Sequence, residues 1–364
     1  MRRITILLPS LASGGAERVM LNLSRGLADR GFDVDMVLAR AKGVYLTMLD
    51  PRIRLVDLNA ERVILAFPAL SRYLRQVQPH AILSSLPHLN LTSVMARGWS
   101  RVKSRLVLVE HGDVALSLKY SVRSWERFFP AAMRVLYPFA DGVVAVSEGV
   151  ADGITSRTGL RRDKITVIHN PIVTPDISEK AAAETNHPWF AAGQWPVIVA
   201  AGRLTALKDY PTLLCAFALL RAQRKVRLVI LGEGELHKEL EILASELGIA
   251  SEVAFVGFQV NPFAFLGRAA VLVLSSVWEG FGNVLVEAMA CGTQVVATDC
   301  PSGPAEILDG GRFGRLVSVG DAPALAAAME AALDHPLPKE VLRERAKVFS
   351  VDAALDRYLP LLMG

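Results

Sequence analysis

The chain has 364 residues, of which 52% are hydrophobic and 21% charged, which suits two α/β domains and excludes a disordered or fibrous protein. Its longest apolar runs, such as Val197 to Ala201, are far shorter than the roughly 18 residues of a membrane-spanning helix. Met1 to Pro9 is typical of a first strand and not of a signal peptide, so we expect a cytoplasmic protein. The cysteines, Cys215, Cys291 and Cys300, form no paired motif, and we expect small buried thiols.

Charge is distributed unevenly along the chain. Residues 1–171 carry 24 Lys and Arg against 14 Asp and Glu, a net charge of +10, whereas the remainder carries 16 against 22, a net charge of −6. Basic and aromatic residues interleave over residues 97–137, as in a helix at a membrane interface. The alternative is a solvated amphipathic helix whose aromatic side chains enter the core. No nucleic-acid-binding motif accompanies the charge, so nucleic acid is not an expected partner.

The basic and aromatic residues of this stretch are interleaved along its length. They are Arg97, Arg101, Lys103, Arg105, Lys119, Tyr120, Arg123, Trp125, Arg127, Phe128, Phe129, Arg134 and Tyr137. If the aromatic members lie on the surface, they form one face that can rest on an anionic membrane.

Short β-branched runs alternate with longer amphipathic segments, which predicts α/β domains with parallel sheets. Strands are predicted at Ile4 to Leu8, Asp33 to Leu38, Ala81 to Ser84, Leu106 to Glu110, Gly142 to Ser147 and Ile165 to His169, and then at Val197 to Ala201, Arg227 to Leu231, Val253 to Val256, Val271 to Leu274, Gln294 to Ala297 and Gly314 to Val317. Four prolines within residues 171–196 place the domain boundary there. Val351 to Met363 is predicted to be a terminal helix.

Three loops carry the candidate chemistry. The first joins a strand to a helix through Gly14 and Gly15, whose backbone can approach a phosphate or sugar closely. The second places Arg203 and Lys208 after the strand that ends at Ala201, where both cations could reach one diphosphate.

The third loop follows the strand that ends at Leu274 and leads into a helix expected from Asn283 to Gly292. Glu279 lies in the loop and Glu287 one turn into the helix. Backbone amides near Gly282 to Leu285 could then bind an anion, while the two carboxylates accept hydrogen bonds from hydroxyl groups. That combination fits a nucleotide-sugar.

With these motifs the chain resembles the retaining GT-B glycosyltransferases of family 4 over essentially its whole length. Glu279 and Glu287 are similar to the E-x7-E motif of that family, Arg203 and Lys208 to its phosphate-binding pair, and Gly14-Gly15-Ala16-Glu17-Arg18 to its glycine loop. The resemblance implies two Rossmann-like domains facing each other across a cleft. It assigns residues 1–171 to an acceptor domain completed by residues 346–364, and residues 190–345 to a donor domain.

The resemblance also implies a role for individual residues. Arg203 and Lys208 would bind the diphosphate, Glu287 the ribose and Glu279 the donor sugar. Backbone amides would come from Phe281, Gly282, Asn283 and Val284, and the nucleobase would lie near Gly257 and Phe258. His111 would lie near the reacting carbon and the acceptor. The reaction would proceed with retention, without a required cofactor or metal, the nucleotide-sugar being a co-substrate.

Two further observations bear on metal and substrate. Asp33 and Asp35 have the spacing of a metal-binding DxD motif but lie inside an apolar strand, and we do not expect them to bind metal. The loop Asp299 to Leu308 is similar to one in bacterial enzymes that build lipid-linked polysaccharides, including N-acetylgalactosamine transferases. It favours a UDP-hexose or UDP-N-acetylhexosamine donor and a polyprenyl-diphosphate-linked rather than a soluble glycan acceptor. A nucleotide-sugar epimerase and a non-catalytic binding scaffold are the alternatives.

Overall fold

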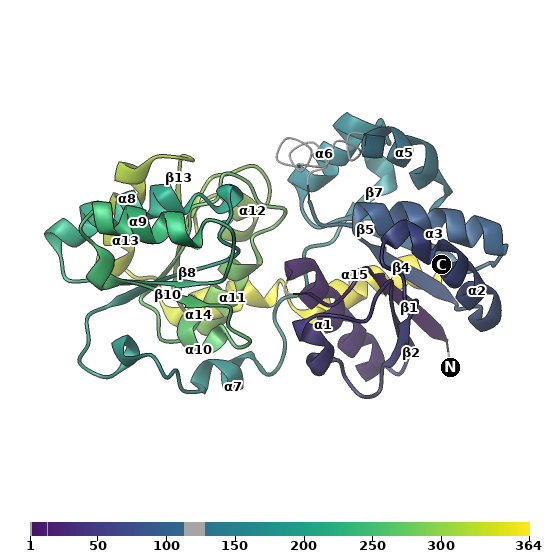
Figure 1. The fold of residues 1–364 in the computed structure, drawn as a ribbon, viewed down its shortest axis with the longest axis horizontal. Helices are drawn as coiled ribbons and strands as arrows, with labels where there is room; N and C mark the ends of the chain where they lie inside the picture. The colour runs from purple at the N-terminus through teal and green to yellow at the C-terminus, as the bar shows by residue number, and fades with distance from the viewer. Residues whose placement is uncertain (1, 13, 113–127) are drawn as a thin grey trace. The chain divides into compact units, whose positions relative to one another are not determined.

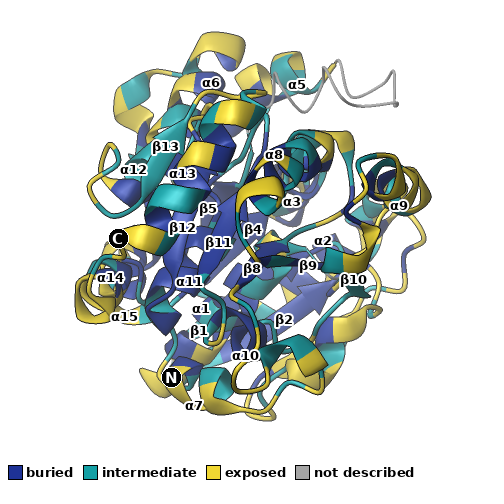
Figure 2. Ribbon diagram, turned by 90° about the vertical axis from the view of Figure 1, so that its left-hand side faces the viewer, coloured by how far each residue is buried: buried dark blue, intermediate teal, exposed yellow. Residues whose placement is uncertain are grey.

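The computed structural model describes residues 2–12, 14–112 and 128–364. The chain divides into two compact units, which are Met1–Ile172 together with Ser350–Gly364, and Val173–Phe349. Each unit is a parallel sheet with helices packed on its faces (Figure 1). Strands in both units are largely buried, whereas the outward faces of the helices are exposed (Figure 2).

The described part of the first unit contains a seven-stranded sheet with the order β3-β2-β1-β4-β5-β6-β7. Its strands are β1 (Arg3–Leu8), β2 (Asp33–Leu38), β3 (Arg54–Asp57), β4 (Ala81–Ser85), β5 (Arg105–Glu110), β6 (Gly142–Ala145) and β7 (Ile165–Val167). Its helices are α1 (Gly15–Asp29), α2 (Phe67–Val77), α3 (Pro87–Ser100), α5 (Phe129–Leu136), α6 (Glu148–Thr158) and α15 (Val351–Met363), with short 3₁₀ turns η1 (Val44–Met48), η2 (Val63–Ala66), η4 (Tyr137–Phe139) and η5 (Arg162–Lys164).

The second unit contains a six-stranded sheet with the order β10-β9-β8-β11-β12-β13. Its strands are β8 (Val197–Ala201), β9 (Arg227–Leu231), β10 (Val253–Gly257), β11 (Val271–Leu274), β12 (Gln294–Thr298) and β13 (Arg315–Val317). Its helices are α7 (Ile177–Ala182), α8 (Tyr210–Gln223), α9 (His237–Glu246), α10 (Phe263–Leu266), α11 (Asn283–Cys291), α12 (Pro304–Leu308), α13 (Ala322–Asp334) and α14 (Lys339–Lys347), with 3₁₀ turns η6 (Pro188–Phe190), η7 (Ala206–Lys208) and η8 (Ala250–Glu252).

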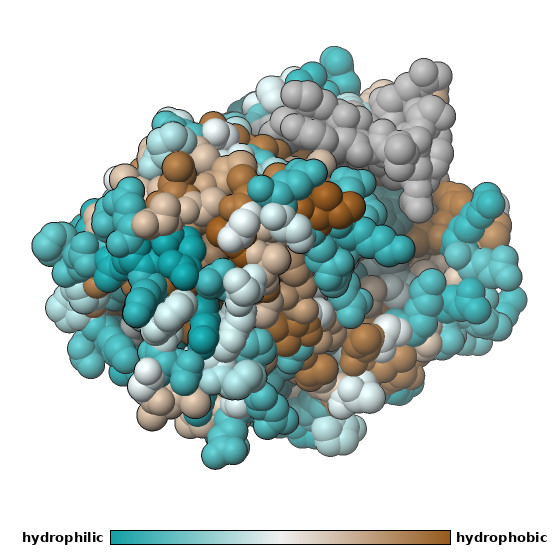
Figure 3. All heavy atoms as spheres, turned by 60° about the vertical axis from the view of Figure 1, so that its left-hand side comes forward, coloured by the Kyte–Doolittle hydropathy of each residue, from teal (hydrophilic) through white to brown (hydrophobic). Residues whose placement is uncertain are grey.

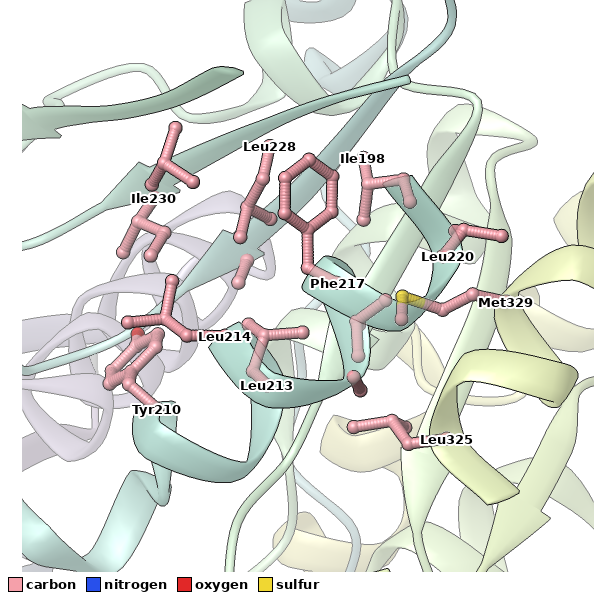
Figure 4. Close-up of a cluster of buried hydrophobic side chains, with 14 of the residues drawn as sticks. Ile198, Tyr210, Leu213, Leu214, Phe217, Leu220, Leu228, Ile230, Leu325 and Met329 are labelled. Atoms are coloured by element: carbon pink, nitrogen blue, oxygen red, sulfur yellow. The ribbon is translucent and has the colours of Figure 1, made fainter. Parts of the chain in front are cut away.

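The core of the second unit lies between its sheet and the helices α8 and α13 (Figure 4). Phe217 of α8 packs toward Ile198 of β8 and Leu228 of β9, and Met329 of α13 closes the same cluster. All four side chains are at most 1% exposed. This packing fixes where β8 and β9 end, and so where the loops that follow them begin.

The predicted strands are confirmed with small shifts at their ends, and the terminal helix is confirmed from Val351 to Met363. The edge strand β3 was not predicted. All four of its residues are exposed or half-buried, so the sequence contains no long apolar run that would predict this strand. The strands predicted to extend to Ser147 and to His169 both end earlier in the structure. Ser147 instead caps α6 by accepting a hydrogen bond from the amide of Val150.

The division between the units differs in detail from the expected ranges. Residues 173–189 belong to the second unit, because Arg268 donates hydrogen bonds to the carbonyls of residues 181–183 at the C-terminal end of α7. Residues 346–349 belong there too, since Phe349 packs on Phe281 with ring centroids 5.5 Å apart. The chain therefore passes into the first unit at Ser350, where α15 packs against α1, β4 and β5.

The stretch 97–137 has a mixed outcome. Residues 113–127, and with them Lys119 through Arg127, lie outside the described residues. Tyr137 is 1% exposed and bonded to Glu110, so it is a core residue and not part of a surface. Arg105 is only partly exposed, and its Nε donates to the carbonyl of Leu361 at 2.9 Å. Within the described ranges, no helix is long and apolar enough to cross a membrane.

The Asp33 and Asp35 pair is structural. Asp35 is 1% exposed and accepts hydrogen bonds from the Arg54 Nε at 2.9 Å and the Tyr73 hydroxyl at 2.5 Å. Asp33 lies on the same strand within 3.9 Å of Arg3. Both oxygens of Asp35 are therefore engaged by side chains of neighbouring elements, which joins β2 to β3 and α2.

The packing of α15 on α1 can be tested at a glycine. A Cβ on Gly26 would lie 2.5 Å from Val351 Cγ1 and 2.8 Å from Leu355 Cδ1, whereas a Cβ on Gly98 of α3 would meet nothing within 4 Å. Both changes to Ala add helix propensity of about 0.5–1 kcal/mol. We expect Gly98→Ala to stabilise the chain and Gly26→Ala to destabilise it by about 1–3 kcal/mol through overpacking. Denaturant unfolding and hydrogen exchange of α15 measure the difference; equal gains in both variants would contradict this packing.

Candidate active site

The candidate donor site lies at the carboxyl edge of the second sheet. Strands β8 and β11 are neighbours although β9 and β10 separate them in sequence, so the chain leaves them in opposite directions. Open parallel sheets bind ligands at such a point, because the loops diverge there and leave room. Lys208 follows β8, and Glu279 follows β11.

The structure brings these two residues into direct contact. Lys208 Nζ forms an ion pair with Glu279 Oε1, and the Ser276 hydroxyl donates to the same oxygen at 2.6 Å. The Lys208 side chain is 22% exposed and that of Glu279 12%. Both contacts fall on Oε1, which leaves Oε2 for a hydroxyl of a ligand. The Ser275 hydroxyl also donates to the Lys208 carbonyl at 2.7 Å, so side chain and backbone together hold the two loops.

Arg203 has a different environment. It is exposed, and in the described part of the chain its guanidinium has no hydrogen-bond or ion-pair partner. The backbone around it is fixed, because the Leu204 amide donates to the Glu233 carbonyl at 3.0 Å. Arg203 is thus an uncommitted cation on a rigid loop, which is a suitable group for an anionic ligand.

Three glycines end consecutive strands β8, β9 and β10 and allow their loops to touch. A Cβ on Gly232 would lie 2.0 Å from the Gly202 carbonyl oxygen, and the Gly232 amide donates to the Gly257 carbonyl at 2.8 Å. Gly257 has a φ of +76°, which glycine adopts without strain. Phe258, predicted beside it near the nucleobase, is half-buried, and its amide lies 3.5 Å from Glu233 Oε1.

Helix α11 begins at Asn283 as predicted, with Gly282 at φ +99° before it and no side-chain cap. Val284 follows in the first turn, half-buried like Asn283, and Glu287 is 8% exposed one turn further. Phe281 is a core residue, only 2% exposed, so only its backbone can face a ligand. The prediction of a free amide at Leu285 is wrong, because that amide donates to the Gly282 carbonyl at 2.9 Å.

Some residues of this site were not singled out in the sequence. Ser276 binds Glu279, and Thr298 of the neighbouring strand β12 donates to the Ser276 carbonyl at 2.5 Å. Gly303 lies against the loop before α11, since a Cβ there would be 1.8 Å from the Phe281 carbonyl oxygen. Serine, threonine and glycine in loops are common, and only their contacts show that they support the acidic loop.

In the first unit, Gly14 caps α1 and Gly15 is the first residue of that helix. A Cβ on Gly14 would lie 2.2 Å from Glu17 Oε2, so the Glu17 carboxylate folds back over the helix start. Glutamate at the third helical position commonly does this. The glycine turn is therefore built closely around an acidic residue, and any anion at these amides would lie near that carboxylate.

His111 follows β5 of the same sheet. Both of its ring nitrogens are buried, and among the described residues neither has a hydrogen-bond partner. Burial lowers the pKa of the imidazole to about 4, so the ring is neutral at ordinary pH. A neutral ring with unused nitrogens can donate one hydrogen bond and accept another.

The three cysteines are free thiols, and Cys291 and Cys300 are buried as expected. The prediction of buried thiols is wrong for Cys215, which is only partly covered. Of the residues that the structure describes, no three His, Cys, Asp or Glu side chains form a group that could hold a metal ion.

The parallel sheets define an α/β protein, and the paired Lys208 and Glu279 with the exposed Arg203 form a candidate site whose chemistry suits an anionic ligand that carries hydroxyls. Family comparisons agree. Residues 13–175 match the model described as Glycosyltransferase Family 4, and residues 184–349 match Glycosyl transferases group 1.

Individual proteins extend this similarity over the whole chain. The N-acetylgalactosamine-N,N'-diacetylbacillosaminyl-diphospho-undecaprenol 4-alpha-N-acetylgalactosaminyltransferase of Campylobacter jejuni is 30% identical over 357 residues, covering 95% of this chain and 94% of that protein. Anabaena HepE, determined in complex with UDP-glucose, superposes with a TM-score of 0.79 at 20% identity over 100% of this chain and 99% of its own. WaaG, a glycosyltransferase involved in lipopolysaccharide biosynthesis, gives 0.75 at 15% identity over 99% and 100%.

The chain therefore belongs to the family 4, group 1 glycosyltransferases, and its predicted α/β fold of the GT-B class is confirmed. It is a glycosyltransferase.

The ion pair between Lys208 and Glu279 gives a test of the site. We expect Lys208→Ala and Glu279→Ala each to lower turnover at least about a hundredfold, because each removes a group that faces the ligand. Each also leaves a partly buried charge unpaired, which costs about 1–3 kcal/mol of stability.

The double variant Lys208→Met with Glu279→Gln separates these two effects. It leaves no charge unpaired, so it should recover stability and remain inactive. Turnover is measured with the donor and acceptor at saturation, and unfolding by denaturant. Activity near that of the wild type in either single variant would exclude this pair from the site.

Proposed function

We propose that this glycosyltransferase transfers a hexose or N-acetylhexosamine from a UDP-sugar to a glycan linked to a polyprenyl diphosphate. The observation that carries the donor side is the pairing of Lys208 with Glu279, with the exposed Arg203 on the same loop as Lys208. Two cations can bind a diphosphate, and a carboxylate oxygen can bind sugar hydroxyls. The UDP-glucose in Anabaena HepE supports a uridine nucleotide.

The acceptor is inferred from a relative. The Campylobacter jejuni protein is named for a sugar acceptor on diphospho-undecaprenol, and it aligns with nearly the whole chain. We assign acceptor binding to the first unit and donor binding to the second. Gly14 and Gly15 would then lie close to the reacting groups, and His111 would contact the acceptor or the donor sugar.

In the proposed reaction, the bond between the sugar C1 and the diphosphate oxygen breaks as the acceptor oxygen bonds to C1 on the same face. The acceptor proton passes to the departing phosphate oxygen, which gives retention. Negative charge grows on the diphosphate, and Arg203 and Lys208 stabilise it without a required metal. The amides of Gly282 and Asn283 at the start of α11 add to this, and Glu287 would bind the ribose.

The nucleobase would lie near Gly257 and Phe258, at the end of β10. The backbone there is held by the Gly232 bridge, and the half-buried phenyl ring offers an apolar surface for a flat base.

We also propose that the first unit rests on an anionic membrane surface on the cytoplasmic side. An apolar groove of about 580 Å³ supports this, lined by Phe67, Val94, Met95, Arg97, Gly98, Trp99, Arg101, Val102, Leu136 and Phe139. Trp99 is 68% exposed and Phe139 65%. Exposed Arg101 and Lys103 follow α3 at one end of it. An indole beside cations is typical of a lipid interface. By contrast, much of the surface visible in Figure 3 is hydrophilic, with hydrophobic residues in separate clusters.

The donor assignment is tested by thermal unfolding with UDP, GDP, ADP and their common sugar conjugates. A ligand at a hundred times its Kd adds about 2.7 kcal/mol of stability. We expect UDP and one UDP-sugar to stabilise the wild type and to have little effect on Lys208→Ala. Stabilisation by GDP alone would point to a different donor, and the absence of any shift would favour the non-catalytic scaffold.

Membrane binding is tested by sedimentation with vesicles of phosphatidylcholine alone or with phosphatidylglycerol. We expect binding to the anionic vesicles only, weakened by salt and reduced at least about tenfold in Trp99→Ser with Phe139→Ser. Ile242→Ser is a matched control, because Ile242 is 58% exposed on α9 of the second unit. Equal loss in the control, or binding independent of anionic lipid, would overturn the assignment. All variants should still bind the donor nucleotide.

A further inference from the structure

A buried polar cluster lies directly beside His111. Glu110 is the last residue of β5 and is fully buried. Its Oε1 accepts a hydrogen bond from Asn90 Nδ2 of α3 at 2.7 Å and another from the Tyr137 hydroxyl of η4. Asn90 also donates to the carbonyl of Val109 at 3.0 Å. A single carboxyl group therefore connects the end of a central strand to two helical segments on one face of the sheet.

This cluster contains no positive charge. In the described part of the chain Glu110 has no ion pair, and its second oxygen, Oε2, has no hydrogen-bond partner. The buried Asn90 Oδ1 also lacks a partner there. Two buried acceptors without a donor are costly, and one proton on Glu110 would supply the missing donor. Burial raises the pKa of Glu110 to about 7, so this carboxyl group holds its proton to a higher pH than an exposed glutamate does.

The position of the cluster relates it to the histidine. Glu110 is the last residue of β5, and its side chain is bonded to Asn90 of α3 and Tyr137 of η4. His111 is the next residue along the chain, so the backbone that leaves Glu110 carries the imidazole. The His111 nitrogens have no partner among the described residues that could orient the ring. Its position therefore depends on the backbone that carries it, and that backbone is held by Glu110.

We propose that Glu110 is a positioning residue that fixes His111 for the transfer reaction, acting through Asn90 and Tyr137 on the end of β5. The inference rests on the proposed role of His111. It predicts that the requirement at residue 110 is for hydrogen bonding and not for negative charge.

Three variants test this. Glu110→Gln keeps an acceptor for Asn90 and Tyr137 and supplies its own donor, so it should retain transfer within about threefold. Glu110→Leu fills a similar volume and removes every hydrogen bond, and should lower kcat by about 10–100-fold with an unchanged KM for the donor, which binds the other unit. Tyr137→Phe removes one bond and should give a smaller loss of kcat. It also decides the question if Glu110→Leu does not fold.

A direct measurement follows the histidine itself. The ring signals of His111 are identified in NMR spectra by their loss in His111→Gln. We expect them to shift in Glu110→Leu and Tyr137→Phe and to stay near their wild-type positions in Glu110→Gln. If the His111 signals stay in place and kcat is unchanged in both Glu110→Leu and Tyr137→Phe, the inference is overturned. It is also overturned if these variants lose donor binding to the same extent as transfer. If His111→Gln retains full transfer activity, the proposed role of His111 in the reaction is wrong. The NMR shifts would still show whether Glu110 positions the imidazole ring.

The pH dependence of stability gives a third readout. Glu110 in the native state binds its proton more tightly than in the unfolded chain, so its advantage is complete below about pH 4.5 and is lost as the pH rises through about 7. The unfolding free energy of the wild type should therefore fall relative to that of Glu110→Gln over this range. In the described part of the chain, Tyr137 and His111 are the titratable neighbours of Glu110, and both are present in the two proteins compared. A parallel pH dependence would contradict a protonated Glu110.

Discussion

The ion pair between Lys208 and Glu279 is the interaction on which the proposed donor site depends. It joins loops that are 71 residues apart in sequence but follow neighbouring strands of one sheet. Because it is only partly exposed, it holds both loops without being fully screened by water. The serines that follow β11 reinforce it, and Arg203 is exposed on the loop that carries Lys208. The ion pair thus holds this loop, and among the described residues the Arg203 guanidinium has no partner.

The two units differ in the charge of the side chains at the carboxyl ends of their strands. The second unit presents cations and a carboxylate, which suits a diphosphate with sugar hydroxyls. The first unit buries neutral groups, since burial keeps the His111 imidazole uncharged and favours a protonated Glu110. Under the proposed function this division is reasonable. A developing phosphate charge needs cations, whereas an acceptor hydroxyl needs a neutral group that can share a hydrogen bond.

Close backbone contact is the second constraint on the donor site. Gly202, Gly232 and Gly257 end three adjacent strands, and a side chain at Gly232 would collide with the Gly202 carbonyl. The loops after β8, β9 and β10 can therefore pack on each other and present their amides and side chains at one edge. Gly303 has the same effect on the loop before α11. These glycines explain how several short loops form one continuous surface.

Much of this protein was determined by local sequence. The apolar runs predicted the strands of both sheets apart from β3, whose exposed residues carry no such signal. The spacing of Arg203, Lys208, Glu279 and Glu287 singled out the loops that we propose to bind the donor. Local sequence could not show that Asp35 and Tyr137 are internal, because burial depends on what packs against a residue. Nor could it show that Lys208 meets Glu279, or that the Glu110 carboxyl group is bonded to Asn90 and Tyr137. Those contacts join residues far apart in sequence, and only the order of the strands in the folded sheets brings them together.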